Sequence, residues 1–190
     1  MNYAIMAGDQ IRNKGTILMP YLLIANMFSF VSACFTAASS WTKDPHRTYW
    51  YQVGQCLVYA AAAYFFGVYS TILMMVINAF RNYLVAAQKY TVRWMIACSL
   101  VSLVAGLAIN GHSIPGYISV LMTVYYTISS FYLKEAKAVK VNVAIDLSMW
   151  FVYDLMVCDV PSGIMDLVGV TLALVTIWRI RRDEKGRDFC

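Results

Sequence analysis

Long apolar stretches alternate with short polar segments along almost the whole chain. A helix needs about 20 apolar residues to cross a bilayer, and seven of the stretches approach or exceed that length. The pattern therefore predicts an all-α integral membrane protein with seven transmembrane helices. The expected helices cover Ile17–Trp41, Trp50–Gly67, Val68–Gln88, Trp94–Asn110, Gly116–Leu133, Val139–Cys158 and Gly163–Ile180.

Basic residues are distributed unevenly over the two sides that such a helix order would create. All of the 15 Lys and Arg residues except Arg12 and Lys14 fall in, or next to, the breaks on one side. Because basic residues remain on the cytoplasmic side, we expect the N-terminus outside and the C-terminus in the cytoplasm. The expected segments are an extracytoplasmic stretch over 1–16, the helical domain over 17–182 and a cytoplasmic tail over 183–190.

Tryptophans support the same orientation. Trp41, Trp50, Trp94 and Trp178 fall at the expected cytoplasmic helix ends, where an amphipathic ring suits the headgroup region. Trp150 is the exception, because it lies in the middle of the sixth expected helix.

Composition excludes several function classes. With 61% hydrophobic and 13% charged residues the chain is not a soluble domain, in which about a quarter of the residues would be charged. The net charge of +5 follows from the topology, so we expect no nucleic-acid partner. The five cysteines lie far apart and the two histidines fall in loops on opposite sides. This pattern lacks any recognisable metal-binding or catalytic motif, so we expect no metal, no cofactor and no enzymatic activity.

Four ionisable residues interrupt the apolar helices: Arg81, Asp146, Asp154 and Asp166. Each would cost several kcal/mol inside a bilayer unless it is paired or faces water, so each is a functional candidate. At helical rise Arg81 lies about 12 Å from Lys89, and Asp146 about 9 Å from Lys140, both measured toward the same surface. The similar depths predict a buried ion pair or gate between the third and sixth helices. Two alternatives stay open, a purely structural pair and an Arg81 that extends to the inner surface.

Polar residues also form stripes on three of the expected helices. Three stripes suggest one shared hydrated interior, although hydrogen bonds between helices without any ligand would give the same pattern. The stripes have helical spacing and consist of Gln52, Gln55 and Tyr59, of Asn78, Arg81 and Asn82, and of Asp146, Trp150, Tyr153 and Asp154.

Acidic residues surround the last outer turn. Asp154 and Asp166 flank Asp159, and no basic residue accompanies them on that side. They would attract cations, or one of them could carry a proton. Trp150 and Tyr153 lie beside them and could hold a flat or cationic ligand by stacking and cation–π attraction.

Two sequence runs carry a family resemblance. One is Asn78-Ala79-Phe80-Arg81-Asn82, and the other contains Trp150 and Tyr153 before a short turn. Together they resemble the YgjV-like family of small bacterial inner-membrane proteins, over roughly residues 49–182. That family is similar to the SWEET, PQ-loop and nicotinamide-riboside-transporter group of seven-helix carriers. The resemblance implies a bundle of three, one and three helices and movement of a small solute, but it supplies no substrate, because fold does not fix function.

The residues and the resemblance together predict a carrier for a small polar metabolite, or an aromatic or cationic one, in the bacterial inner membrane. Asn78, Asn82, Gln55 and Tyr59 would bind the solute, and Trp150 and Tyr153 would stack on it. Arg81 and Asp146 would hold or gate the inner side, and Asp154 and Asp166 would form the outer entrance.

Two other functions stay open at this point. One is a solute-capturing subunit of a larger vitamin-uptake system, and the other is a structural or sensory membrane protein. The sequence leaves open proton coupling, self-association and the identity of the solute. Its one certain partner is the lipid bilayer.

Overall fold

A computed structural model of the chain describes residues 18–66, 69–109, 114–157 and 160–187. These ranges contain seven α-helices, which follow the expected apolar stretches closely. The helices are α2 (Leu18–Trp41), α3 (Pro45–Phe66), α4 (Tyr69–Ala86), α5 (Val92–Ile109), α6 (Ile114–Tyr132), α7 (Ala136–Val157) and α8 (Val160–Arg187).

The largest differences from the expected boundaries lie at the start of α3 and the end of α8. Helix α3 begins at Pro45 instead of Trp50, because Asp44 caps it: the His46 backbone N–H donates to Asp44 Oδ1 at 2.9 Å. Proline suits the first helical position because its missing N–H would have no partner there. Helix α8 continues to Arg187, beyond the expected end at Ile180. The polar residues of both regions predicted loops. Polar residues can nevertheless form helix where the helix extends beyond its apolar span.

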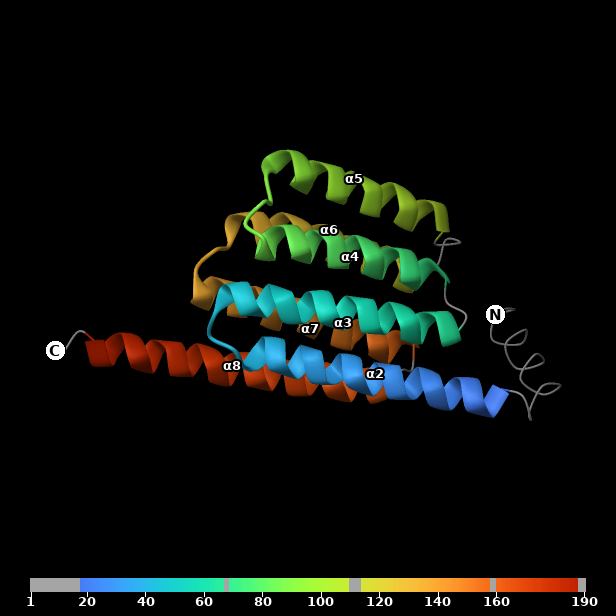
Figure 1. The fold of residues 1–190 in the computed structure, drawn as a ribbon, viewed down its shortest axis with the longest axis horizontal. Coiled ribbons are helices and arrows are strands. Elements are labelled where there is room, and N and C mark those ends of the chain that lie inside the picture. The colour runs from blue at the N-terminus through green and yellow to red at the C-terminus, as the bar shows by residue number, and fades with distance from the viewer. Residues whose placement is uncertain (1–17, 67–68, 110–113, 158–159, 188–190) are drawn as a thin grey trace.

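Helices that follow one another in sequence lie side by side and point in alternating directions (Figure 1). Helix α3 packs between α2 and α4, and α7 packs between α6 and α8. The two groups meet where α8 contacts α2 and where α4 contacts α6. The core between them is formed by Tyr49 of α3, Tyr126 of α6 and Val143 of α7, with further residues of α4 and α8.

Helix α5 lies at the edge of the bundle, against α6 and α4 (Figure 1). Its buried residues are Cys98, Ser102 and Gly106, which form a single stripe at four-residue spacing. A Cβ on Gly106 would lie 2.2 Å from Val120 Cγ2, so glycine allows α5 and α6 to approach closely. Most other residues of α5 are apolar and exposed, as expected of a helix that faces lipid.

Among the described residues, three helices are long and apolar enough to cross a membrane. The spans are Leu23–Trp41, Val92–Ile109 and Ser162–Glu184, with mean hydropathies of 1.4, 2.0 and 1.7. Polar side chains lower the hydropathy of helices such as α4, which contains Asn78, Arg81 and Asn82, and α7. The all-α fold is confirmed, whereas seven crossings and their direction stay predictions.

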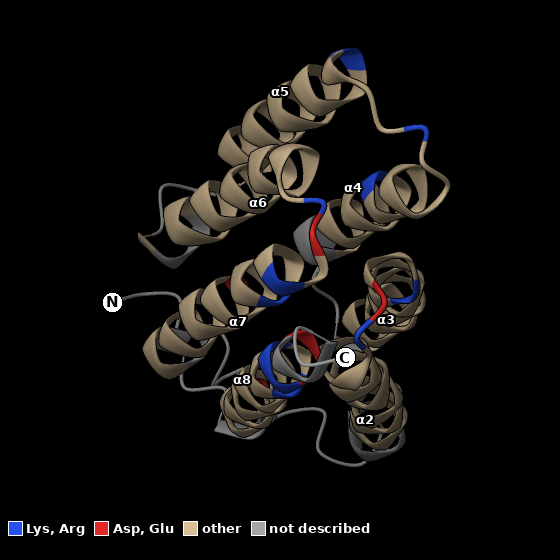
Figure 2. Cartoon of the chain, turned by 90° about the vertical axis from the view of Figure 1, so that its left-hand side faces the viewer, with Lys and Arg blue, Asp and Glu red and all other residues tan. Residues whose placement is uncertain are grey.

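The basic segments lie together at one end of the bundle (Figure 2). The α2–α3, α4–α5 and α6–α7 connections and the end of α8 all lie there (Figure 1). The four tryptophans expected at this end are each more than 40% exposed; Trp41, Trp50 and Trp94 lie within about two turns of a helix end, and Trp178 lies in the last third of α8. Basic and amphipathic residues therefore mark one end of the molecule, as they would at a membrane surface.

Candidate functional site

Arg81 lies in the interior between α4 and α6, with 4% of its surface exposed. Its Nη1 donates to Asn78 Oδ1 and to Thr127 Oγ1, both at 3.1 Å. Its Nε and Nη2 donate to Asn82 Oδ1 at 3.2 and 2.9 Å. The guanidinium carbon is 4.7 Å from the ring centre of Tyr126, a cation–π distance. The positive charge is therefore held by neutral groups.

Helix α3 completes the surroundings of Arg81. Gln52 and the Tyr126 hydroxyl exchange hydrogen bonds at 2.7 and 3.0 Å. Asn82 Nδ2 donates to Cys56 Sγ at 3.8 Å. We call this set of buried residues the arginine cluster; it joins α3, α4 and α6. Its members are Gln52, Cys56, Asn78, Arg81, Asn82, Tyr126 and Thr127.

The α4 stripe was predicted from spacing alone. Asn78, Arg81 and Asn82 stand at i, i+3 and i+4 and share the inner face of the helix, with at most 7% exposure each. Arg81 does not extend to the surface, because its donors are engaged by its own helix and by Thr127.

Tyr90 supports the cluster from the connection between α4 and α5. Its hydroxyl donates to the Thr127 backbone oxygen at 2.9 Å. Burial raises the pKa of Tyr90 above its ordinary value, so the hydroxyl stays protonated and remains a donor. This bond fixes the part of α6 that presents Thr127 to Arg81.

Asp146 of α7 lies within electrostatic range of Arg81, Cys56 and Tyr126. It does not form an ion pair with Arg81, because none of their charged atoms approach within 4.0 Å. Among the described residues its carboxylate accepts no hydrogen bond. The Arg81 guanidinium and the Asp146 carboxyl group are thus near each other but not in contact.

Asn142 precedes Asp146 by four residues on the same face of α7. It is fully buried, yet neither its Nδ2 nor its Oδ1 has a hydrogen-bond partner in the described part of the chain. Buried polar atoms are rarely left unpaired, because each unmade hydrogen bond costs about 1–3 kcal/mol. Asn142 and Asp146 therefore form a polar face of α7 whose bonding capacity is unused.

The predicted aromatic residues contact each other. The rings of Trp150 and Tyr153 are 5.4 Å apart, at 77°, one helical turn beyond Asp146. Both are partly buried, as are Gln55, Tyr59 and Asp166. Neither Gln55 nor Trp150 hydrogen-bonds to Arg81, whose donors go to Asn78, Asn82 and Thr127. The side chain of Asp154 and the whole of Asp159 lie outside the described part of the structure.

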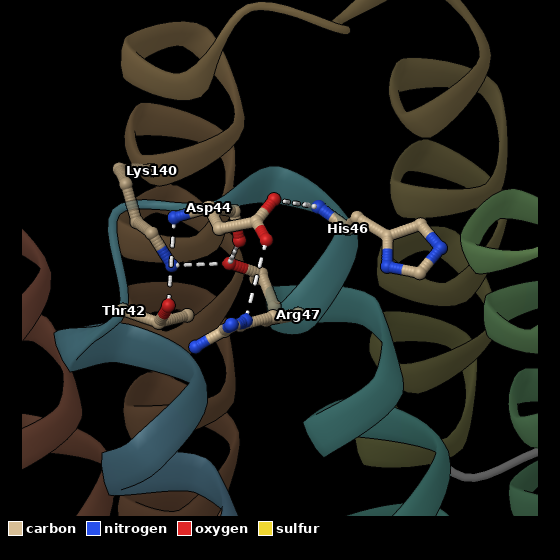
Figure 3. Close-up of polar contacts among 6 residues, drawn as sticks. Thr42, Asp44, His46, Arg47 and Lys140 are labelled. Atoms are coloured by element: carbon tan, nitrogen blue, oxygen red, sulfur yellow. Dashed lines mark hydrogen bonds and ion pairs between the residues drawn. The ribbon is translucent and has the colours of Figure 1, made fainter.

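Lys140 was counted as a charge at the inner surface, but it is fully buried. Its Nζ donates to the Ser39 backbone oxygen of α2 and, at 2.7 Å, to Thr48 Oγ1 of α3. Asp44, whose carboxylate caps α3 and contacts Arg47, lies beside it (Figure 3). This lysine therefore ties α7 to α2 and α3 near the basic end. We call it the lysine lock.

Sequence reasoning missed several of these residues. Tyr126 and Thr127 looked like ordinary residues of an apolar helix, and only the packing of α6 brings them to Arg81. Cys56 was noted only as one of five widely spaced cysteines without a metal-binding pattern. Asn142 could have been found, since it continues the predicted α7 stripe one turn before Asp146.

Two grooves in the described part of the structure are apolar. One, of about 650 Å³, runs along α7 between α6 and α8 and is lined by residues such as Ile145, Val152 and Leu174. The other, of about 220 Å³, lies between α5 and α6. Neither is lined by a member of the arginine cluster or by Trp150. The described residues also contain no group of His, Cys, Asp and Glu able to hold a metal ion.

Comparison with known families identifies the chain. It matches Imp-YgjV, a family of bacterial inner membrane proteins, over residues 23–184. Because the match covers most of the chain, the protein belongs to this family and to the bacterial inner membrane, as the sequence predicted. No match was found among curated proteins or among solved structures. The relation to the SWEET and PQ-loop group stays a prediction.

Proposed function

We propose that this inner membrane protein is a carrier for a small polar solute, which binds at the arginine cluster. In this proposal all seven helices cross the membrane, with the N-terminus outside and the C-terminus in the cytoplasm. The segregation of basic residues at one end supports that orientation.

The single observation that carries the proposal is that Arg81 is a buried cation whose direct contacts are all neutral. It is buried in a membrane-protein interior and contacted by Asn78, Asn82, Thr127 and the Tyr126 ring, all neutral. A charge inside a bilayer costs roughly 3 kcal/mol or more, and such residues typically mark the path of a substrate or ion. If this position served packing alone, an apolar residue would fill it without the free-energy cost of burying a charge.

The neighbours of Arg81 have the chemistry of a solute site. Two carboxamides and two hydroxyls provide donors and acceptors, and the Tyr126 ring adds a flat apolar face. The described grooves do not reach the cluster, so the solute would gain access when α4 and α6 move apart. Carriers with internal repeats move one helix group against another in this manner. Trp150 and Tyr153 would line the path on the outer side.

A binding screen followed by uptake into vesicles tests the proposal. The purified protein is melted in detergent against amino acids, nucleosides, vitamins and sugars, since a ligand of the folded state raises the melting temperature. Hits are then tested as radiolabelled solutes in proteoliposomes. Arg81→Gln should abolish binding and uptake, whereas the control Arg93→Gln, at the exposed start of α5, should leave both intact.

Three outcomes would count against the proposal. If Arg81→Gln retains uptake, the site assignment is wrong. If solutes bind but enter vesicles only when a co-purifying energising protein is present, the chain is a capturing subunit. If nothing in the screen binds or moves, a structural or sensory role becomes the better explanation of the buried polar residues.

A further inference from the structure

The arginine cluster lies next to a second polar region, the α7 face formed by Asn142 and Asp146. Side chains on one helix face four residues apart have Cβ atoms about 6 Å apart, so the amide and the carboxylate can contact one small group together. Within the described residues, both Asn142 polar atoms and the Asp146 carboxylate lack hydrogen-bond partners. This face therefore presents two kinds of acceptor, one of them an acid, that no described residue uses.

The arrangement differs from a structural ion pair. An Arg–Asp pair that only fixed helix packing would be in direct contact, because attraction offsets the cost of burial best at short range. Arg81 is instead engaged by neutral groups, and Asp146 remains apart while still within its electrostatic field. The Tyr126 ring packs on Arg81 and lies within electrostatic range of Asp146.

We propose that the solute is a small zwitterion, with its carboxylate bound by Arg81 and its ammonium bound by Asp146 and Asn142. This inference rests on the proposed carrier function and specifies its substrate class. A guanidinium has the fork geometry that suits a carboxylate, and the Asn142 and Asp146 oxygens accept from an ammonium. Such a solute has no net charge. It would place a negative group against Arg81 and a positive group against Asp146 without adding net charge to the interior.

Matched ligands test the two halves of the site separately. The probes are the twenty amino acids, glycine betaine and 4-aminobutyrate, each compared with a relative lacking one charge. For alanine the relatives are propionate and ethylammonium, and for 4-aminobutyrate they are butyrate and propylammonium. Sodium chloride and potassium chloride alone are included as further arms. We expect at least one zwitterion to bind at least about tenfold more tightly than both of its relatives, because each lost charge pair removes a charge-assisted contact.

Variants assign the charges. Asp146→Asn should weaken the zwitterion at least about tenfold and bring its affinity close to that of the carboxylate relative. Arg81→Gln should lower the affinity for the zwitterion to that of the amine relative, which we expect to lie below the detection limit of the screen. Asn142→Leu, which removes unpartnered polar atoms, should keep its melting temperature and still weaken the zwitterion. The control Asp183→Asn removes a carboxylate that bonds Lys43 near the basic end, and should leave the affinities unchanged.

Each alternative result separates this inference from the proposed function. If an uncharged solute, a monoanion or sodium binds best and still depends on Arg81, the carrier proposal stands and the zwitterion inference is wrong. The inference is also wrong if Asp146→Asn and Asn142→Leu fold and bind the zwitterion as the parent does. If none of these probes binds but a nucleoside, vitamin or sugar of the first screen does, only the zwitterion inference fails; if neither set contains a ligand, both proposals fail.

Discussion

Lys140 and Arg81 are two buried cations in the same bundle, and their partners differ. Lys140 bonds a backbone oxygen at the end of α2 and the Thr48 hydroxyl. The carbonyl end of a helix carries partial negative charge, so a cation there is stabilised by the fold itself. Arg81 is held by side-chain amides and a hydroxyl, while the nearby Asp146 stays unpartnered.

The comparison shows that burial by itself does not mark a functional charge. The lysine lock has its acceptors in place and connects three helices, which is what a structural role requires. The arginine cluster and the α7 face keep a guanidinium and a carboxyl group apart and leave acceptors without a donor, which lowers the stability of the protein. Stability should therefore depend on Lys140, and binding should depend on Arg81. The following predictions test that contrast, beginning with the largest expected effect.

Lys140→Ala should destabilise the protein by about 2–4 kcal/mol, because it leaves the Ser39 oxygen and the Thr48 hydroxyl unpaired and creates a cavity. The apparent melting temperature in detergent, measured without added solute, should fall clearly. The matched control is Lys137→Ala in the same turn region of α7, where the side chain is only partly buried. Equal melting temperatures of the two variants would show that Lys140 does not stabilise the packing of α7 against α2 and α3.

Arg81→Met should destabilise the protein by less than about 1.5 kcal/mol, because removing a buried charge that has no ion-pair partner offsets much of the cost of leaving the Asn78, Asn82 and Thr127 acceptors without a donor. The same variant should lose solute binding completely. Melting curves with and without the best ligand of the screen separate the two effects. A loss of stability as large as that of Lys140→Ala would mean that Arg81 is itself structural.

Asp44→Ala should have the smallest effect, about 1 kcal/mol, since it removes the cap of α3 at an exposed position. Its ion pair with Arg47 is exposed and adds little. Asp44→Asn, which retains a capping oxygen, should melt close to the parent. If Asp44→Ala instead affected ligand affinity, the two regions would be coupled and the contrast between them would need revision.

Much of the fold could be predicted, because spanning helices follow directly from long apolar stretches. The expected ends of α2 and α4 through α7 were close to the observed ones, and the α4 stripe of Asn78, Arg81 and Asn82 was buried as predicted. The start of α3 was missed, since Asp44 and Pro45 read as loop residues unless their capping role is considered.

The candidate site could be predicted only in part. Arg81 and Asp146 stood out because ionisable residues are rare in apolar helices. Their neutral partners did not stand out, since tyrosine, threonine and cysteine are common in such helices. Lys140 was misassigned because a basic residue near a loop usually faces water, and nothing in the local sequence shows that α2 and α3 cover it.

The sequence by itself determined the helices, the membrane environment and the end of the bundle at which the basic residues gather, because hydropathy and charge act locally along the chain. Only the tertiary structure decided which polar residues meet. Whether Arg81 faces Thr127 or Asp146, and whether Lys140 faces water or the end of α2, depends on how helices distant in sequence pack against one another. Those contacts arise from the shapes of whole helix faces, which no single stretch of sequence contains.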